Sequence, residues 1–113
     1  MLPRANRLVK ESEFKQVAQK ARPLHSQFLI LKKIPFHDNP TVFGLVISAK
    51  VSKKAVVRNQ IRRRLRAILR SGLPNIASGF KVMLVVKNAM IGRNFKEIES
   101  DLNGLLKKSN LLW

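Results

Sequence analysis

The sequence predicts an α+β fold in the order α-β-β-α-β-α, with the helices packed mainly on one side of the sheet. Hydrophobic residues recur at helical spacing in three segments and form short apolar runs in three others, and these segments alternate along the chain in the order just given. The length of 113 residues and the apolar content of 45% suit a single domain with one core, which we expect to cover residues 1–113.

The first half of the chain should form one helix and two strands. Phe14, Val17 and Ala21 lie at helical spacing within 11–21, a helix that Ser12 or a neighbour is expected to cap. The residue before Pro23 avoids helical angles, so this helix should end there. Apolar runs then predict strands over 28–34 and 41–48, joined by a polar turn over 37–40.

A strongly basic helix is predicted over 54–70. Its apolar residues fall on one stripe that must pack against the sheet: Val57, Ile61, Leu65 and Ile68. Polar and basic residues lie between about 100° and 200° from that stripe, on the opposite face: Asn59, Arg62, Arg63, Arg66 and Arg70. Gly72 is expected to supply a left-handed cap, and Pro74 should prevent the helix from continuing.

The last strand and the last helix complete the predicted order. The apolar run over 80–87 predicts a strand that is too hydrophobic for an open edge. Asn94 and Glu97 form a capping-box pattern that opens a helix ending near 107–108. Carboxylates early in a helix offset its dipole, so we predict no metal site from the acids that gather there: Glu97, Glu99 and Asp101.

The charge of the chain points to a polyanionic partner. There are 23 Lys and Arg against 6 Asp and Glu, a net charge of +17, and the acid-free segment 50–70 is the most basic part. Neutralising phosphates releases counterions, which favours nucleic acid as the partner. The absence of Cys excludes disulfides, thiolate nucleophiles and Cys-based metal sites. Residues 1–10 contain no apolar run, so we expect neither a signal peptide nor a membrane anchor, and a cytoplasmic protein.

Two segments of the chain resemble the protein component of bacterial ribonuclease P. One is SAKVSKKAVVRNQIRR, from Ser48 to Arg63, and the other is Asn6-Arg7-Leu8 followed by Glu13-Phe14. The resemblance runs from end to end and implies an α/β two-layer sandwich with a mostly antiparallel sheet of three or four strands, similar to the second domain of ribosomal protein S5. It also implies a left-handed β-α-β crossover through the basic helix and a short extra strand near 24–26.

The resemblance implies a protein subunit of the endonuclease that removes the 5′ leader from precursor tRNA. In that family an Arg-Asn-Arg tripeptide opens the basic helix and contacts the catalytic RNA. Here Gln60 replaces the second Arg, so a hydrogen bond from this position lacks charge assistance. The residues expected to bind ribonuclease P RNA are Lys50, Lys53, Lys54, Arg58, Asn59, Gln60, Arg62, Arg63, Arg66 and Arg70.

The single-stranded leader is expected in a cleft between the first helix and the exposed sheet face. The residues expected to line it are Asn6, Arg7, Phe14, Lys15, Ala18, Leu31 and Ser48. The family often has aromatic residues at the positions of Ala18 and Leu31, so this cleft should stack fewer bases. Phe14 is either a stacking platform or a core residue. The other five phenylalanines are interpreted as core or strand residues: Phe28, Phe36, Phe43, Phe80 and Phe95.

The resemblance further implies that the RNA carries the catalytic groups and most of the Mg²⁺ of the holoenzyme. We therefore expect no catalytic residue and no tightly bound metal in this chain, and one protein monomer per RNA. Three alternatives remain open from the residues. The chain could be a ribosomal or other structural RNA-binding protein, or a stand-alone ribonuclease using His25 and His37. A membrane-surface protein is least favoured, because the basic helix has no exposed aromatic face.

Overall fold

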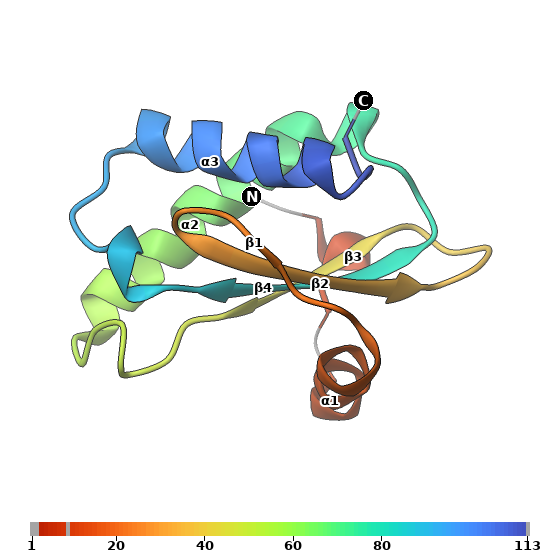
Figure 1. Ribbon diagram of the computed structural model, residues 1–113, viewed down its shortest axis with the longest axis horizontal. Helices are drawn as coiled ribbons and strands as arrows, with labels where there is room; N and C mark the ends of the chain where they lie inside the picture. Colours follow the sequence, from red (N-terminus) through yellow and green to blue (C-terminus); the bar gives the residue numbers. More distant parts are fainter. Residues whose placement is uncertain (1–2, 9, 113) are drawn as a thin grey trace.

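The structure, a computed structural model, describes residues 3–8 and 10–112 and has its elements in the predicted order (Figure 1). The helices are α1 (Glu11–Lys20), α2 (Ala55–Gly72) and α3 (Phe95–Lys108). The strands are β1 (Leu24–His25), β2 (Leu29–Pro35), β3 (Val42–Val46) and β4 (Phe80–Val86), and three short 3-10 turns are η1 (Arg4–Asn6), η2 (Leu73–Asn75) and η3 (Asn88–Met90). The predicted helices and strands are confirmed, including the short extra strand β1.

The four strands form one sheet in the order β1-β2-β4-β3. The β1–β2 and β2–β4 pairs are antiparallel and the β3–β4 pair is parallel, so the sheet is mostly antiparallel. The turn over 37–40 joins β2 and β3, yet these strands are not neighbours, because the apolar strand β4 lies between them. Viewed from the side of α2 with β3 and β4 running upward, β4 lies to the left of β3, so the crossover through α2 is left-handed (Figure 1).

The sheet separates two apolar clusters of unequal size. α2 and α3 cover one face and α1 lies alone on the other, beneath one end of the sheet (Figure 1). The larger cluster joins the sheet to α2 and α3, and it includes Leu31, Leu65 and Leu102. The smaller cluster, with Val17 and Met83 at its centre, holds α1 against β2 and β4. The helices therefore lie mainly on one face, as predicted.

The C-terminal end of α2 differs from the prediction. Gly72 has φ −87° and ψ −9°, a right-handed conformation, and is the last residue of α2 instead of a left-handed cap. The chain continues through Leu73 into η2, where Pro74 occupies an early helical position that needs no N–H donor. The predicted glycine cap is therefore wrong, since the proline reshapes the end of the helix into a 3-10 turn.

The starts of the other two helices gave one wrong and one correct prediction. Lys10 is the N-cap of α1 and makes no side-chain capping bond, whereas Ser12 lies inside the helix. The capping box of α3 is confirmed, because Asn94 Oδ1 accepts from the Glu97 N–H at 2.9 Å and Glu97 Oε1 accepts from the Asn94 N–H at 3.2 Å. Phe95 follows that cap and is 40% exposed, so its predicted core position is wrong; it precedes the buried stripe that begins at Ile98.

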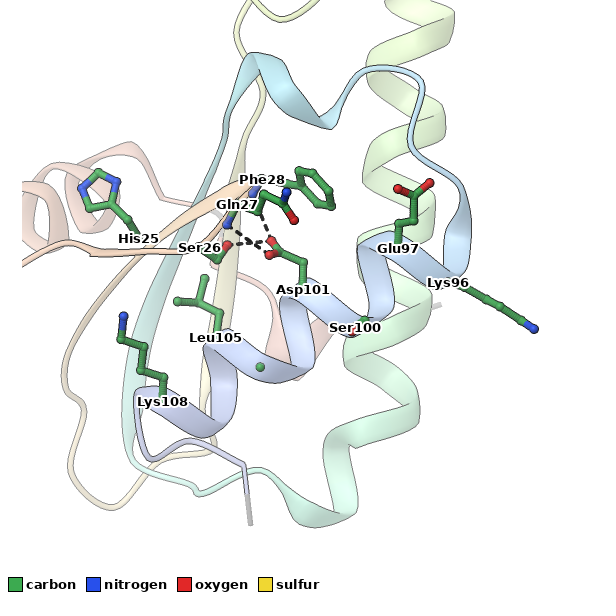
Figure 2. A pocket seen from close by; sticks show the side chains of 11 residues that line it. His25, Ser26, Gln27, Phe28, Lys96, Glu97, Ser100, Asp101, Leu105 and Lys108 are labelled. Atoms are coloured by element: carbon green, nitrogen blue, oxygen red, sulfur yellow. Dashed lines mark hydrogen bonds between the residues drawn. The ribbon is translucent and has the colours of Figure 1, made fainter.

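Asp101 of α3 binds the turn between β1 and β2 (Figure 2). Its carboxylate accepts from Ser26 Oγ at 2.6 Å and from the backbone N–H groups of Gln27 and Phe28, each at 3.1 Å. Within the described residues, no group of three His, Cys, Asp or Glu side chains could hold a metal ion. Glu97 therefore caps α3, and Asp101 holds the turn between β1 and β2 against α3.

Candidate nucleic-acid interface

The basic side of α2 is held outward because its opposite side is buried. Ile61, Leu65 and Ile68 are buried against the sheet and α3, and Val57 is half-buried. The arginine face, as we call the opposite side, carries three exposed residues and two half-buried ones. Exposed are Asn59, Arg63 and Arg70, and half-buried are Arg62 and Arg66. The predicted stripe and the predicted basic face are thus both present on one helix.

Uncharged oxygen atoms orient arginines of α2, among them Arg58 and Arg62. Arg62 Nη1 donates to Asn59 Oδ1 at 3.0 Å, and Arg58 Nη1 donates to the carbonyl oxygen of Ser52 at 2.7 Å. Each guanidinium group has five N–H donors, so one such bond orients it without exhausting its donors. These bonds also leave the positive charges in place, because a carbonyl or amide oxygen does not neutralise a guanidinium.

Acidic side chains are paired elsewhere. Within the described part of the chain, three ion pairs are present: Lys15–Glu11 at 3.9 Å, Lys81–Glu13 at 3.2 Å and Arg93–Glu97 at 3.5 Å. None of these three pairs includes a residue of α2. The arginine face therefore presents a positive field that no carboxylate of the described residues neutralises.

A shallow hollow lies in the arginine face. It has a cavity volume of about 340 Å³ and is lined by Val56, Asn59, Arg62, Arg63 and Arg66. Val56 is 77% exposed. An apolar methyl surface surrounded by guanidinium groups suits contact with a ribose or a base whose phosphates the arginines bind.

The N-terminal segment brings Arg7 beside the arginine face. Arg7 forms a parallel bridge with Phe43, and the Leu8 N–H donates to the Phe43 carbonyl oxygen at 2.8 Å, so this segment continues the sheet beyond β3. Partial burial lowers the pKa of Arg66, and the nearby charges of Arg7 and Arg62 lower this pKa further. Arg7, predicted in the leader cleft, therefore also adjoins the predicted RNA-binding residues.

The lysines before α2 strengthen the same field. Lys50, Lys53 and Lys54 are exposed in the loop between β3 and α2, and Lys54 is the N-cap of α2. The first turn of α2 contains no acid, so these charges lie at the positive end of the helix dipole without compensation. Gln60 is exposed on the side of α2 that borders α3. The structure thus brings all ten predicted RNA-binding residues to α2 and the loop before it.

The residues predicted for the leader cleft lie in three different places. Phe14 is half-buried and packs so closely on β3 that a Cβ atom added to Gly44 would lie 2.3 Å from Phe14 Cε1. Lys15 and Ala18 are exposed on α1, and the Ala18 carbonyl oxygen accepts from Lys32 Nζ at 3.3 Å. The half-buried Asn6 donates from Nδ2 to the Thr41 carbonyl oxygen at 2.9 Å, and Ser48 is exposed beyond β3. Of these residues, Phe14, Lys15 and Ala18 belong to α1, the helix that packs on the sheet face opposite α2 and α3 (Figure 1).

Leu31 does not belong to this set. It is fully buried in the larger cluster, on the sheet face that α2 and α3 cover. Side chains alternate between the faces of a strand, so the residue beside it, Ile30, lies on the α1 face instead. Ile30 pairs with Val85, and Val85 with Val46, in a half-buried apolar row that sequence reasoning missed. The sequence carries no signal for this row, because residues 28–31 are apolar at every position and do not alternate.

The two histidines are far apart. His25 is paired with Ile30 near the start of β2, whereas His37 follows the end of the same strand. The five steps along β2 from Ile30 to Pro35 alone span roughly 17 Å at about 3.3 Å per residue. Both side chains are exposed, and neither can reach a reacting group held by the other. This separation argues against a ribonuclease that uses the pair as acid and base.

Comparisons with known proteins agree with this arrangement. The sequence model of one protein family, described as Ribonuclease P, matches residues 2–110. The chain is 36% identical to the ribonuclease P protein component of Microcystis aeruginosa, over 98% of this chain and 96% of that one. It is 38% identical to the same component of a Pseudanabaena species, over 99% and 97% of the two chains.

Solved structures show the same fold at lower identity. The RNase P protein of Staphylococcus aureus superposes with a TM-score of 0.88 at 18% identity, covering 97% of this chain and 100% of that one. The RNase P protein of Thermotoga maritima superposes with a TM-score of 0.82 at 22% identity, covering 90% and 96% of the two chains. Among the described residues, no helix is both long enough and apolar enough to cross a bilayer.

Proposed function

The chain belongs to the family of bacterial ribonuclease P protein components, and from this premise we propose that it binds ribonuclease P RNA through the arginine face of α2. The holoenzyme so formed removes the 5′ leader from precursor tRNA. The observation that carries the proposal is a row of outward arginines, anchored by a buried stripe and unpaired with the acids of the described residues. Guanidinium groups bind phosphates with two parallel hydrogen bonds, so such a row suits a folded RNA.

We assign the 5′ leader to the sheet face beside α1. Lys15 and Ala18 border this face from α1, and the half-buried row of Ile30, Val46 and Val85 offers apolar contact to bases. Phe14 is half-buried and packs on Gly44, so its ring is only partly available for stacking on a base. The contact with the leader is therefore mostly aliphatic. The affinity for the leader then depends less on base stacking than the affinity of a cleft lined by aromatic side chains would.

Catalysis is assigned to the RNA. Mg²⁺ would supply charge neutralisation and an activated water, and the phosphates of the RNA are the ligands we propose for it. The acids on α3 do not fit a tight protein site, since Asp101 accepts three hydrogen bonds and Glu97 caps the helix. The role of the protein is then to neutralise phosphates in the complex, so that the RNA folds and cleaves with less Mg²⁺. We propose one protein monomer per RNA.

The test is cleavage of a precursor tRNA by the ribonuclease P RNA from the same genome at low Mg²⁺. Adding the protein should restore cleavage at the mature 5′ end, and the double variant R62E/R63E should not. The matched control is K107E/K108E, which makes the same charge change on exposed residues at the end of α3. The proposal is overturned if the wild-type protein fails to restore cleavage.

The same assay separates the alternatives. A structural RNA-binding protein would bind the RNA without restoring cleavage. A stand-alone ribonuclease would cleave without the RNA, and it would lose activity in the double variant H25A/H37A. We expect that variant to restore cleavage as the wild type does.

A further inference from the structure

A second groove lies between α2 and the loop that leads into α3. Its cavity volume is about 330 Å³, at the lower end of the volumes that hold small ligands. The floor is apolar, with Ile61, Met90 and Ile98 buried and Val57 half-buried. The rim is polar and basic, and it consists of Gln60, Arg64, Ile91, Gly92, Arg93 and Asn94.

The rim of this groove is open to solvent. Ile91 is 50% exposed, and Gly92, with φ +77°, has no atom within 4 Å of the place where a Cβ would stand. Arg64 Nη1 donates to the Arg93 carbonyl oxygen at 3.1 Å, which ties the loop to α2. The carboxylate on this side, Glu97, is engaged in the cap of α3 and lies 3.5 Å from Arg93 Nη1. The rest of the Arg93 guanidinium is also engaged, because Nε donates to the Ala89 carbonyl oxygen at 3.1 Å and the guanidinium carbon lies 5.0 Å from the centre of the Phe28 ring. The groove thus joins an apolar floor to a rim on which Arg64 carries a positive charge that no carboxylate of the described residues pairs.

The groove is continuous with the arginine face. Gln60 lines the groove and stands next in sequence to Asn59, which lines the hollow in that face. On a helical wheel, Gln60 and Arg64 lie about 260° and 300° from Ile61, between the arginine face and the buried stripe. An RNA segment lying on the arginine face can therefore extend over the side of α2 into this groove.

We propose that the groove binds one unpaired nucleotide of the ribonuclease P RNA. The base lies on the apolar floor, Gln60 meets the base edge, and Arg64 faces its phosphate. A glutamine amide both donates and accepts hydrogen bonds, as a base edge requires, whereas an arginine only donates. This inference rests on the proposed function, because the nucleotide belongs to that RNA.

Photocrosslinking tests the position of the nucleotide. The chain has no Cys, so I91C carries a single thiol that an aryl azide reagent labels at the rim of the groove. The labelled protein in complex with the RNA should crosslink to one unpaired nucleotide, mapped by primer extension. The control is S100C, whose exposed side chain lines a different groove on α3 (Figure 2). Crosslinks from I91C that fall only in paired helices, or none at all, would overturn the inference.

Affinity measurements give a second, independent readout. Q60A and I91D should each weaken binding of the RNA by about fivefold or more, the size of one lost base contact. S100D adds the same charge as I91D outside the groove and should bind as the wild type does. If I91D and S100D bind the RNA with equal affinity, the inference is overturned. The proposed function still holds in that case if R62E/R63E loses affinity for the RNA. If the wild-type protein neither binds the RNA nor restores cleavage, the proposed function fails, and this inference fails with it.

Discussion

Single arginines on α2 differ in how firmly they are oriented before any RNA arrives. Arg62 is held by Asn59, and Arg58 by the Ser52 carbonyl oxygen, so each loses little conformational freedom on binding a phosphate. Arg66 is half-buried beside two other cations, and this crowding is relieved when a phosphate enters. The residues that sequence reasoning treated as one basic row are thus individually positioned by their neighbours.

Replacing Arg62 by Ala should weaken RNA binding and flatten its salt dependence. Each lost phosphate contact lowers the slope of log affinity against log salt by about 0.7–0.9. Filter binding of the RNA at several salt concentrations measures this slope, with K107A as the control for lost charge alone. A slope equal to that of the wild type would mean that Arg62 does not reach the RNA backbone.

Replacing Gly44 by Ala should destabilise the fold. The added Cβ would lie 2.3 Å from Phe14 Cε1, so the ring or the strand must move, which costs about 1–3 kcal/mol. Urea unfolding measures the change. G104A is the matched control, because Gly104 lies on an exposed part of α3 with open space around its Cα, and Ala favours the helix there. A neutral G44A would show that Phe14 is not packed on β3.

At the level of elements, helices were easier to predict than their ends, and strands were easier to predict than the face on which each strand residue lies. The stripe of α2 and the capping box of α3 are local patterns, and both are present in the structure. The end of α2 was predicted wrongly, because Gly-Leu-Pro is compatible both with a left-handed stop and with a 3-10 continuation. Leu31 was assigned to the wrong face, since an apolar run such as Leu29-Ile30-Leu31 shows no alternation from which a face can be read.

The end of α2 leads to a third prediction. Because Gly72 has a right-handed conformation and an added Cβ would meet its nearest heavy atom at an ordinary 3.7 Å, G72A should not be strained. Removing glycine from a helical position reduces the entropy of the unfolded chain and should stabilise the protein by about 0.4–1 kcal/mol. Urea unfolding at constant m-value is the measurement. A loss of more than about 1 kcal/mol would instead support the left-handed cap that the sequence predicts.

For the molecule as a whole, charge is the dominant feature. A net charge of +17 with three ion pairs among the described residues leaves strong repulsion within the folded chain. Much of this charge lies on α2, on the loop before it and on the N-terminal segment that approaches α2 beside β3. The fold therefore concentrates repulsion at the surface where the RNA is proposed to bind.

This repulsion predicts opposite effects of salt on the free and bound protein. Added NaCl screens the like charges, so the melting temperature of the free protein should rise with salt. Bound RNA should stabilise the protein by about 2.7 kcal/mol at a hundredfold excess over Kd, and this gain should shrink as salt weakens binding. Thermal melts with and without RNA across a salt series measure both trends. A free protein whose stability falls with salt would contradict the prediction.

Local sequence patterns are sufficient to predict the element order, the buried stripe of α2 and the charge of its opposite face, because these depend on residues within one or two turns of one another. Its family motif also indicated the fold and its partner. The three-dimensional arrangement was needed to show that β4 lies between β2 and β3, that Leu31 faces α2 and α3, and that Arg7 adjoins Arg66. It also brought Gln60 and Arg93 to one groove. These features depend on contacts between residues far apart along the chain, and local patterns carry no information about such distances.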